Sequence, residues 1–309
     1  MTTTPEMLQK QLADLRKANN VTLPKDDSRA FMRDAVASAA TLKKLYFYPA
    51  KAPEGQIDVL GVKKRRMKLH QGVNTVPNGT DIVEERVVPF LLTKVFTDMW
   101  LEDENIYYTA QSRGDNVSDT IVSMLRDQFS ADMQDLAFNG DKASAVDFLK
   151  MKDGYLKLAR ENEDTIKHDV TGDIKVMDLQ TVPPTVAPEQ LRVGNYVWIM
   201  GRGTHTKLQA EVIARETPKG DAVLIDGELA KLHGYSIELV DHIEEDVVLF
   251  TPLENLTVVT GYEVKYTRAT PSEFAVAKES TYHYLSASVD FLIRTPKALV
   301  YIGADAVTP

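Results

Sequence analysis

The sequence contains no cysteine, and this absence excludes several classes of site at once. A chain without thiols forms no disulfide, carries no thiolate nucleophile and offers no sulfur ligand to zinc. Long apolar runs are absent too, since no stretch reaches the ~18 consecutive apolar residues of a membrane-spanning helix. Charged side chains interrupt the first thirty positions, so no apolar signal-peptide core is predicted. We therefore expect a protein of a reducing cytosol, with neither a secretory signal nor a membrane span.

The composition that remains is that of a globular protein. The 309 residues allow two domains, or one elaborated domain, at roughly 100–200 residues per domain. Hydrophobic residues make up 43% and charged residues 26%, which excludes wholesale disorder. The net charge of −9 repels the chain as a whole from phosphate backbones, so wholesale coating of DNA is disfavoured.

The N-terminal region predicts two short helices and no core of its own. Residues 5–18 place Leu8, Leu12 and Leu15 at helical spacing, and a second helix is expected over about 28–42. Isolated helices of this length are marginal in water. We therefore predict an arm that packs on another part of the assembly, such as a neighbouring subunit.

A long hairpin is predicted next. Residues 57–73 and 82–96 are extended in pattern, and the turn Pro77-Asn78-Gly79-Thr80 between them favours the positive φ angles of a hairpin tip. Twelve residues per arm would make a ribbon on the order of 40 Å long. A two-stranded ribbon of that size is marginal by itself.

The strongest helix signal in the chain spans residues 115–139. Its apolar positions form one continuous stripe at helical spacing. They are Val117, Ile121, Met124, Leu125, Phe129, Met133 and Leu136. The pair Asn139-Gly140 predicts an exit from the helix through the left-handed region. At 1.5 Å per residue this helix is about 37 Å long, which makes it a spine for the fold.

The second half of the chain predicts a compact α+β lobe followed by long strands. Prolines at 183, 184 and 188 indicate a boundary, because they fit neither a helix interior nor a central strand. Short apolar runs then predict strands at 193–200, 223–225, 237–240 and 247–250, with a helix over 208–215. Alternation over 256–266, 273–278 and 282–293 predicts a meander whose one face, with Ser286, Ser288 and Asp290, is wetted.

Residues with catalytic or ligating chemistry form no strong motif. None of the six histidines belongs to the His-Glu-x-x-His pattern of helical zinc proteases, and no Gly-x-Ser-x-Gly elbow occurs. Gly201-Arg202-Gly203 lacks the remaining residues of a phosphate loop. We predict no catalytic residue, no metal and no cofactor. The alternative from another class is a soluble two-domain enzyme with an acidic cleft, in which Asp241, His242 and Glu244 act as acid–base groups.

One dense basic run stands out in the acidic chain, at the start of the predicted hairpin. It consists of Lys63, Lys64, Arg65, Arg66 and Lys68. It has three interpretations: nucleic-acid contact, a solvated face, or an electrostatic latch onto an acidic patch of a neighbouring copy. The last is favoured, since Glu102, Asp103 and Glu104 supply such a patch. These eight residues are the predicted inter-subunit contacts.

The order of elements and several local motifs resemble the major capsid proteins of tailed phages, which have the Hong Kong 97 capsid fold. The motifs are Leu60-Gly61-Val62-Lys63-Lys64-Arg65, Phe138-Asn139-Gly140-Asp141, Asp153-Gly154-Tyr155-Leu156-Lys157-Leu158-Ala159 and Thr251-Pro252-Leu253-Glu254-Asn255-Leu256. The resemblance implies an α+β fold with an N-terminal arm (1–50), an extended loop (51–100), a peripheral domain (101–165 and 251–294) and an axial domain (166–250 and 295–309).

The resemblance also implies a function. A protein of this family assembles in the cytoplasm of a host bacterium into pentameric and hexameric capsomers of an icosahedral virion shell, which encloses double-stranded DNA without reading its sequence. Portal protein, a separate scaffolding protein and decoration proteins are the further partners implied, because the chain begins without the long scaffolding segment of some relatives. The same fold also builds nanocompartments that enclose enzymes, and this stays an open alternative.

Overall fold

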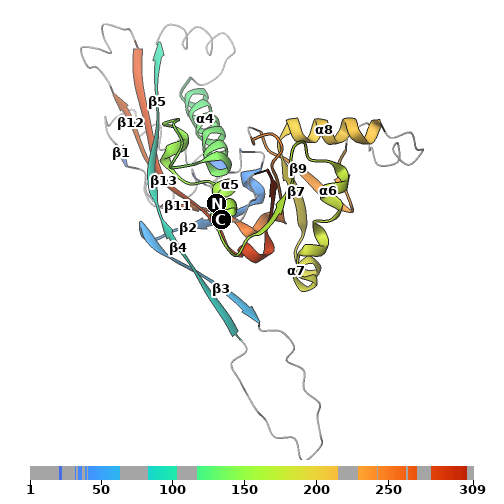
Figure 1. The fold of residues 1–309 in the computed structure, drawn as a ribbon. Coiled ribbons are helices and arrows are strands. Elements are labelled where there is room, and N and C mark those ends of the chain that lie inside the picture. The colour runs from blue at the N-terminus through green and yellow to red at the C-terminus, as the bar shows by residue number, and fades with distance from the viewer. Residues whose placement is uncertain are drawn as a thin grey trace, which may run out of the picture.

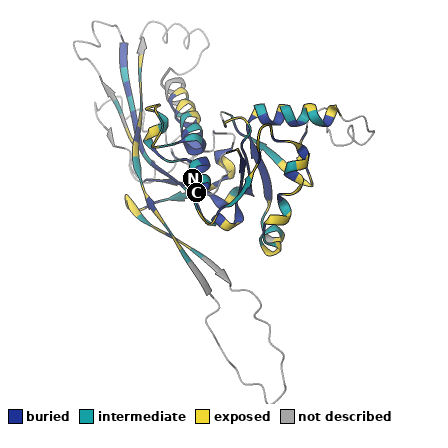
Figure 2. Ribbon diagram, in the orientation of Figure 1, coloured by how far each residue is buried: buried dark blue, intermediate teal, exposed yellow. Residues whose placement is uncertain are grey.

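A computed structural model describes residues 21–22, 32, 34–36, 39, 41–62, 83–102, 117–214, 229–241, 243–261, 264–269 and 280–304. These residues form two lobes, each built on a six-stranded sheet, and a two-stranded hairpin that projects from the first lobe (Figure 1). Buried residues are concentrated in the two lobes (Figure 2).

The first sheet is organised around one long central strand. Its strands are β1 (Val21–Thr22), β2 (Tyr46–Pro49), β5 (Thr93–Glu102), β11 (Leu256–Thr260), β12 (Lys265–Ala269) and β13 (Ser280–Ile293). β13 pairs antiparallel with β5 along one edge and with β12 and then β11 along the other, and β2 runs parallel to β11. The strand order is β1-β12-β13-β11-β2, with β5 on the opposite side of β13.

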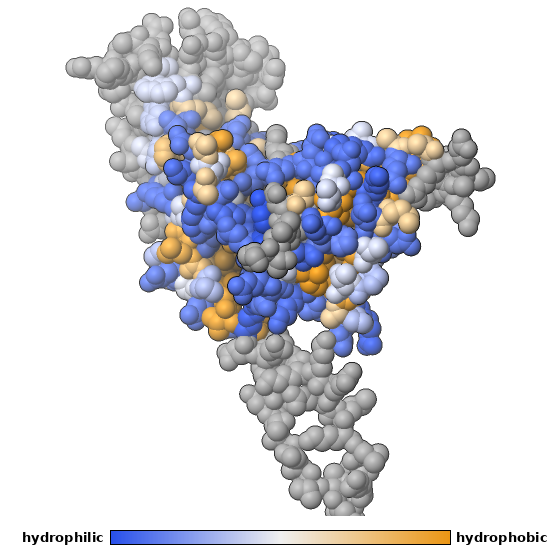
Figure 3. Space-filling view, viewed as in Figure 1, coloured by the Kyte–Doolittle hydropathy of each residue, from blue (hydrophilic) through white to orange (hydrophobic). Residues whose placement is uncertain are grey.

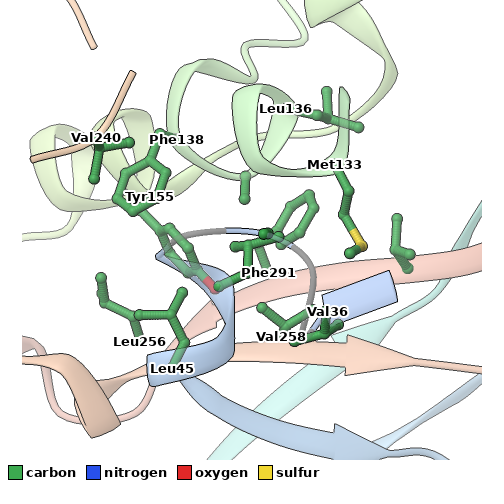
Figure 4. Close-up of a cluster of buried hydrophobic side chains, with 14 of the residues drawn as sticks. Val36, Leu45, Met133, Leu136, Phe138, Tyr155, Val240, Leu256, Val258 and Phe291 are labelled. Carbon is green, nitrogen blue, oxygen red and sulfur yellow. The ribbon is translucent and has the colours of Figure 1, made fainter. Parts of the chain in front are cut away.

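The predicted spine helix is confirmed as α4 (Val117–Asn139), which lies beside α5 (Tyr155–Glu161) on one face of this sheet. The stripe residues Phe129, Met133 and Leu136 are buried in the core that joins both helices to β13. Figure 4 shows Met133 and Leu136 there. Leu125 is buried as well. Met124 was predicted to belong to this stripe, but it is 52% exposed. At 100° per residue it lies beyond the edge of a stripe already filled by Leu125. The face opposite α4 is called the outer face below.

The N-terminal region packs inside its own subunit more than its sequence predicted. Met32 and residues 34–36 are helical, and Met32, Ala35 and Val36 are buried in the core of the first lobe. Leu42, in the 3-10 turn η1 (Leu42–Lys44), is also buried there. These residues have no separate core, as predicted, but the apolar surface on which they pack is α4 of their own subunit. The first predicted helix, 5–18, lies outside the described residues.

The predicted wetted face of the last strand is also corrected. Ser286 and Asp290 alternate with buried apolar residues, as the pattern indicated, yet they are 1% and 2% exposed. Strands flank β13 on both edges, so Ser286 is enclosed between Phe96 of β5 and Lys265 of β12. The alternation predicted the strand correctly. It did not predict that β13 is a central strand with a neighbouring strand on each edge.

The second lobe has a mixed sheet with the order β6-β14-β10-β7-β9-β8. Its elements are β6 (Ile166–Asp169), α6 (Val176–Gln180), η4 (Pro183–Thr185), α7 (Pro188–Val193), β7 (Tyr196–Met200), α8 (Arg202–Ile213), β8 (Lys231–Leu232), β9 (Tyr235–Leu239), β10 (Val248–Pro252) and β14 (Val300–Gly303). All five residues of β7 are buried. The proline-rich segment contributes Val182 and Val186 to this lobe's core, so it is no boundary. Gly201-Arg202-Gly203 begins α8.

The projecting hairpin consists of β3 (Glu54–Val62) and β4 (Val83–Leu91), paired antiparallel from Glu54↔Leu91 to Val62↔Val83 (Figure 1). The predicted turn at 77–80 lies outside the described residues. The returning arm was expected to continue to Phe96, but β4 ends at Leu91, and from Thr93 the chain belongs to the first sheet. Three further 3-10 turns complete the fold: η3 (Leu149–Met151), η5 (Leu253–Asn255) and η6 (Pro296–Ala298).

Candidate assembly interface

The predicted contact residues lie mostly beyond the part of the chain that the structure describes. Lys63, Lys64, Arg65, Arg66 and Lys68 follow the last described residue of β3, and Asp103 and Glu104 follow the last residue of β5. Glu102 is described through its backbone, as the end of β5 opposite Ser280. The basic run therefore follows directly on a strand of the projecting hairpin, and the acidic run follows directly on a strand of the body.

The outer face of the first sheet carries an exposed aromatic patch, formed by Phe96, Trp100, Tyr282 and Tyr284 of β5 and β13. The rings of Phe96 and Tyr284 are stacked with centroids 5.4 Å apart, and those of Trp100 and Tyr282 are 5.0 Å apart. Phe96 is 60% exposed and Trp100 44%. Exposed contiguous apolar surface of this kind marks interaction sites.

A carboxylate lies within this aromatic patch. Asp98, between Phe96 and Trp100 on the same face of β5, accepts a hydrogen bond from the Tyr282 hydroxyl at 3.1 Å. The pKa of Tyr282 is raised by desolvation and by this bond. The patch therefore combines ring surface with negative charge, which suits a partner that brings apolar and basic side chains.

The base of the hairpin is fixed to the body by a separate small core. Ala50, Ile57, Phe90 and Val259 are buried together. Gly55 lies against the Phe90 ring, and a Cβ there would come within 2.7 Å of it. Figure 3 shows apolar residues reaching the surface just above the hairpin. The hairpin is thus rooted in the first lobe while its strands extend away from it.

A buried ion pair lies at the junction of the hairpin and the body. Lys152 Nζ and Asp290 Oδ1 are 2.8 Å apart, with 10% and 3% of their side chains exposed. Asp290 accepts the backbone N–H of Leu91 at 2.8 Å, and Lys152 donates to the Leu91 carbonyl at 2.8 Å. Both backbone groups of the last residue of β4 are therefore bound by this pair.

A hollow of about 330 Å³ lies between β5 and α4, on the helix side of the sheet. Val95, Phe129, Met133 and Phe148 line it, and Asp132 lies among them. Desolvation raises the pKa of Asp132, against a hydrogen bond from Gln128 that lowers it. The hollow separates the spine helix from the strand that carries the aromatic patch.

The two lobes are tied to each other by polar contacts. Thr41 donates its backbone N–H to Gln134 of α4 at 3.3 Å and its hydroxyl to the Leu239 carbonyl at 3.4 Å. Lys44 pairs with Glu238 of β9 at 2.6 Å. The N-terminal segment therefore bridges the spine helix and the second lobe.

The acid–base residues of the enzyme alternative are not brought together in a cleft. Asp241 pairs with Arg202 at 2.6 Å and Glu244 with Arg160 at 3.7 Å, and both carboxylates are about half exposed or more. His242 lies outside the described residues. Within the described ranges no group of three histidine or acidic side chains is placed to hold a metal. Nor does any helix there combine the length and apolar character needed to cross a bilayer.

Lys207 forms ion pairs with three further acidic residues of this region. It lies 2.8 Å from Asp173, 3.2 Å from Glu245 and 2.9 Å from Asp246. These bonds raise the pKa of Lys207, and the bond from Lys207 lowers that of Asp173. This acidic cluster of the second lobe, which includes Glu245 and Asp246, keeps a net negative charge, because one lysine faces three carboxylates.

Sequence reasoning missed the residues that anchor the hairpin. The alternation with apolar neighbours predicted a wetted position for Asp290, and no pattern singled out Lys152. Phe96 was predicted only as the last residue of the returning strand, and Trp100 was not singled out. Their spacing of four in a strand places both on one face, and this signal could have identified an aromatic patch.

Comparison with known proteins begins with two negative results: no family model and no curated protein matches the sequence. Solved structures do match. A chain of the satellite phage P4 procapsid that includes the size determination (Sid) protein has a TM-score of 0.70 at 17% identity, with 97% of each chain covered. The capsid of an empty GTA particle has a TM-score of 0.60 at 12% identity, covering 86% of this chain and 89% of that one.

A virus-like particle from Pyrococcus furiosus has a TM-score of 0.51 at 15% identity, covering 89% of this chain and 97% of that one. These likenesses define the class: the chain has the fold of proteins that build viral and virus-like shells. The particular fold is the Hong Kong 97 capsid fold, which confirms the α+β class that the sequence predicted.

Proposed function

We propose that this protein is the major capsid protein of a tailed phage, a subunit that assembles with copies of itself into a closed icosahedral shell around double-stranded DNA. The hairpin carries the proposal: in a chain with a capsid fold, β3 and β4 leave the body with only their base in a core (Figure 1). A ribbon of this kind is marginal alone and gains stability by packing on another surface. Obligate interfaces commonly bury ~2,000 Å² or more.

We propose that the subunit is divided into four parts. We assign residues 1–50 to an arm, 51–100 to an extended loop, 101–165 with 251–294 to a peripheral domain and 166–250 with 295–309 to an axial domain. A hydrophobic core confined to one face of the second sheet and its helices supports this division, while the other face of that sheet packs into the core of the first lobe. Rings of five and six copies, joined by heterologous contacts, would close such a subunit into a shell.

The aromatic patch and the acidic run beside it are the proposed receptor for a neighbour's hairpin. The basic run Lys63–Lys68 would approach Asp98 and residues 102–104 of the next copy, while apolar hairpin residues cover Phe96 and Trp100. Charge complementarity then steers the encounter, and desolvation of the rings supplies the affinity. The acidic charge of the whole chain disfavours an alternative role of the run in binding nucleic acid.

Further partners belong to the same proposal. The P4 procapsid structure contains a size determination protein, which is a property of that particle. For this chain we propose assembly in the host cytoplasm with a separate scaffolding protein, a portal and decoration proteins. The enclosed DNA would meet an acidic protein, along which it slides without strong attachment.

The test is the state of the purified protein. Negative-stain micrographs are expected to show rings, tubes or shells, and sedimentation is expected to show species far larger than 34.5 kDa. A single monomeric boundary at every salt concentration would count against the proposal. Particles isolated from the native host are expected to contain nuclease-protected DNA. Particles filled with another protein would instead favour the nanocompartment alternative.

A further inference from the structure

The hairpin joins the body where β4 meets β5, and this junction is bound by side chains from the body. β4 ends at Leu91 and β5 begins at Thr93. Between them, the Leu92 N–H donates to the carbonyl of Pro53 at 2.8 Å, which closes the base of the ribbon. The N–H of Leu91 is bound by Asp290 and its carbonyl by Lys152. The Leu91 side chain is 61% exposed, so the junction is held through its backbone.

Both members of the ion pair are themselves fixed. Asp290 lies in the central strand β13, and Oδ1, the oxygen that pairs with Lys152, also accepts the backbone N–H of Phe291 at 2.7 Å. Lys152 lies in the tight crossing of Gly140 and Gly154, whose backbones are joined by a hydrogen bond from Gly154 N–H to the Gly140 carbonyl at 2.8 Å. The pair therefore connects the hairpin to two rigid parts of the first lobe.

The energetics of such a pair favour a role in specificity. Burying a lysine and an aspartate costs most of what their attraction returns, and an apolar pair of similar volume is often as stable. What an apolar pair cannot do is bind the N–H and the carbonyl of one residue at the same time. Without the hydrogen bonds to the Leu91 N–H and carbonyl, only the small apolar core at the base of the hairpin would fix the hairpin's direction.

We infer that Lys152 and Asp290 are positioning residues that set the angle at which the hairpin leaves the body. The inference rests on the proposed function, because the angle matters only if a neighbour receives the hairpin. A nine-residue strand at ~3.3 Å per residue is about 30 Å long, so a swing of about 10° at Leu91 moves its far end by about 5 Å and Asp58 by about 2 Å. Displacements of that size would place the hairpin beside its receptor instead of on it.

Spin labels can measure the angle directly, because the chain has no cysteine of its own. Asp58→Cys on β3 and Ala131→Cys on α4 are both exposed and place one label on the hairpin and one on the spine helix. Pulsed electron resonance on the labelled, unassembled protein is expected to give one narrow distance distribution. In the double variant Lys152→Met with Asp290→Leu, which removes both the donor and the acceptor, the distribution is expected to broaden or shift by about 2 Å or more.

The control is the exposed pair Arg202 and Asp241, changed in the same way to Arg202→Met with Asp241→Leu, which is expected to leave the distribution unchanged. If the double variant does not fold, the single variant Lys152→Met is measured instead. An unaltered distribution in a folded variant at Lys152 and Asp290 would overturn the inference.

Micrographs of the same proteins keep this result separate from the proposed function. Irregular or absent particles only in the Lys152/Asp290 variant are the expected outcome. Absence of particles in every protein, including the parent, counts against the shell function while the distance measurement still decides the role of the pair. Regular particles from a variant with a broadened distribution would show that the angle does not control assembly.

Discussion

Gly140 lies directly against the carbonyl oxygen of Lys152, so closely that no side chain fits at residue 140. A Cβ there would also lie 2.6 Å from the carbonyl oxygen of Leu136 and 3.0 Å from the nitrogen of Gly154. All of these neighbours are backbone atoms, which cannot turn aside as a flexible side chain can. The end of the spine helix and the segment that carries Lys152 are thereby held in contact.

Gly140→Ala is expected to destabilise the subunit by about 3 kcal/mol, the upper part of the range for overpacking a tight site. Urea denaturation of the unassembled protein, followed by tryptophan fluorescence, measures this loss. Gly172→Ala is the matched control, since Gly172 has a φ of 87° but nothing within 4 Å of its added Cβ. That change is expected to cost about 1 kcal/mol from the backbone conformation alone. Equal losses at the two sites would contradict the steric account.

The same glycine shows what a local pattern can and cannot predict. Asn139-Gly140 was expected to leave the helix with a positive φ, but the described residues with positive φ are Gly172, His233, Gly234 and Asp246. The pattern therefore predicted the end of the helix correctly, but a positive φ is not the reason why residue 140 is glycine. The true reason, a close approach of residue 152, is a tertiary contact that no local window contains.

The basic run on the hairpin is expected to act in assembly and not in folding. Changing Lys64, Arg65 and Arg66 together to glutamate should leave the unfolding midpoint of the unassembled subunit unchanged and reduce the yield of particles severalfold. High salt should weaken assembly of the parent protein, because the Debye length falls to about 3 Å at 1 M. Sedimentation velocity over a salt series measures both effects.

A matched charge change elsewhere separates a specific latch from a general effect of net charge. Lys150, Lys175 and Lys231 are exposed lysines of the body, and their joint replacement by glutamate changes the charge by the same amount. Assembly of that variant is expected to be close to the parent's. A comparable loss in both variants would indicate that overall repulsion, and not the hairpin, is responsible.

The aromatic patch predicts a second assembly defect of different origin. Phe96→Ser with Trp100→Ser removes exposed rings that contribute little to the isolated subunit, so its stability should change by less than about 1 kcal/mol. Particle yield should fall strongly, and added salt should not restore it, because the lost contact is apolar. Val95→Ser is the control on the other face: Val95 is 7% exposed and packs toward α4, so its replacement should destabilise the fold by about 2 kcal/mol or more.

The parts of the site that could be predicted are those whose interactions are local in the sequence. The hairpin, the spine helix and the basic run were visible in the sequence, because periodicity, turn residues and charge are local signals. The binding of Leu91 by Lys152 and Asp290 joins segments 61 and 199 residues apart. The burial of Asp290 likewise depends on strands that reach both edges of β13. Nothing near either residue in the chain records such contacts.

Tyr196 predicts a change in stability at alkaline pH. Burial raises its pKa to about 12, its ring packs 4.9 Å from that of Phe250, and its hydroxyl has no hydrogen-bond partner in the described part of the fold. The unfolded chain releases this proton near pH 10 and the folded chain does not. The stability that the protonated Tyr196 hydroxyl contributes is therefore fully present below pH 10 and is lost as the pH rises through 12.

Tyr196→Phe keeps the ring and removes the titrating proton. The variant should be as stable as the parent at pH 7, or about 1 kcal/mol more stable, and should lose less stability between pH 10 and 12. Urea midpoints measured across this range test the assignment, with Tyr46→Phe, at an exposed tyrosine, as the control that should follow the parent. Identical alkaline profiles for the parent and Tyr196→Phe would show that the hydroxyl is hydrated in the folded protein.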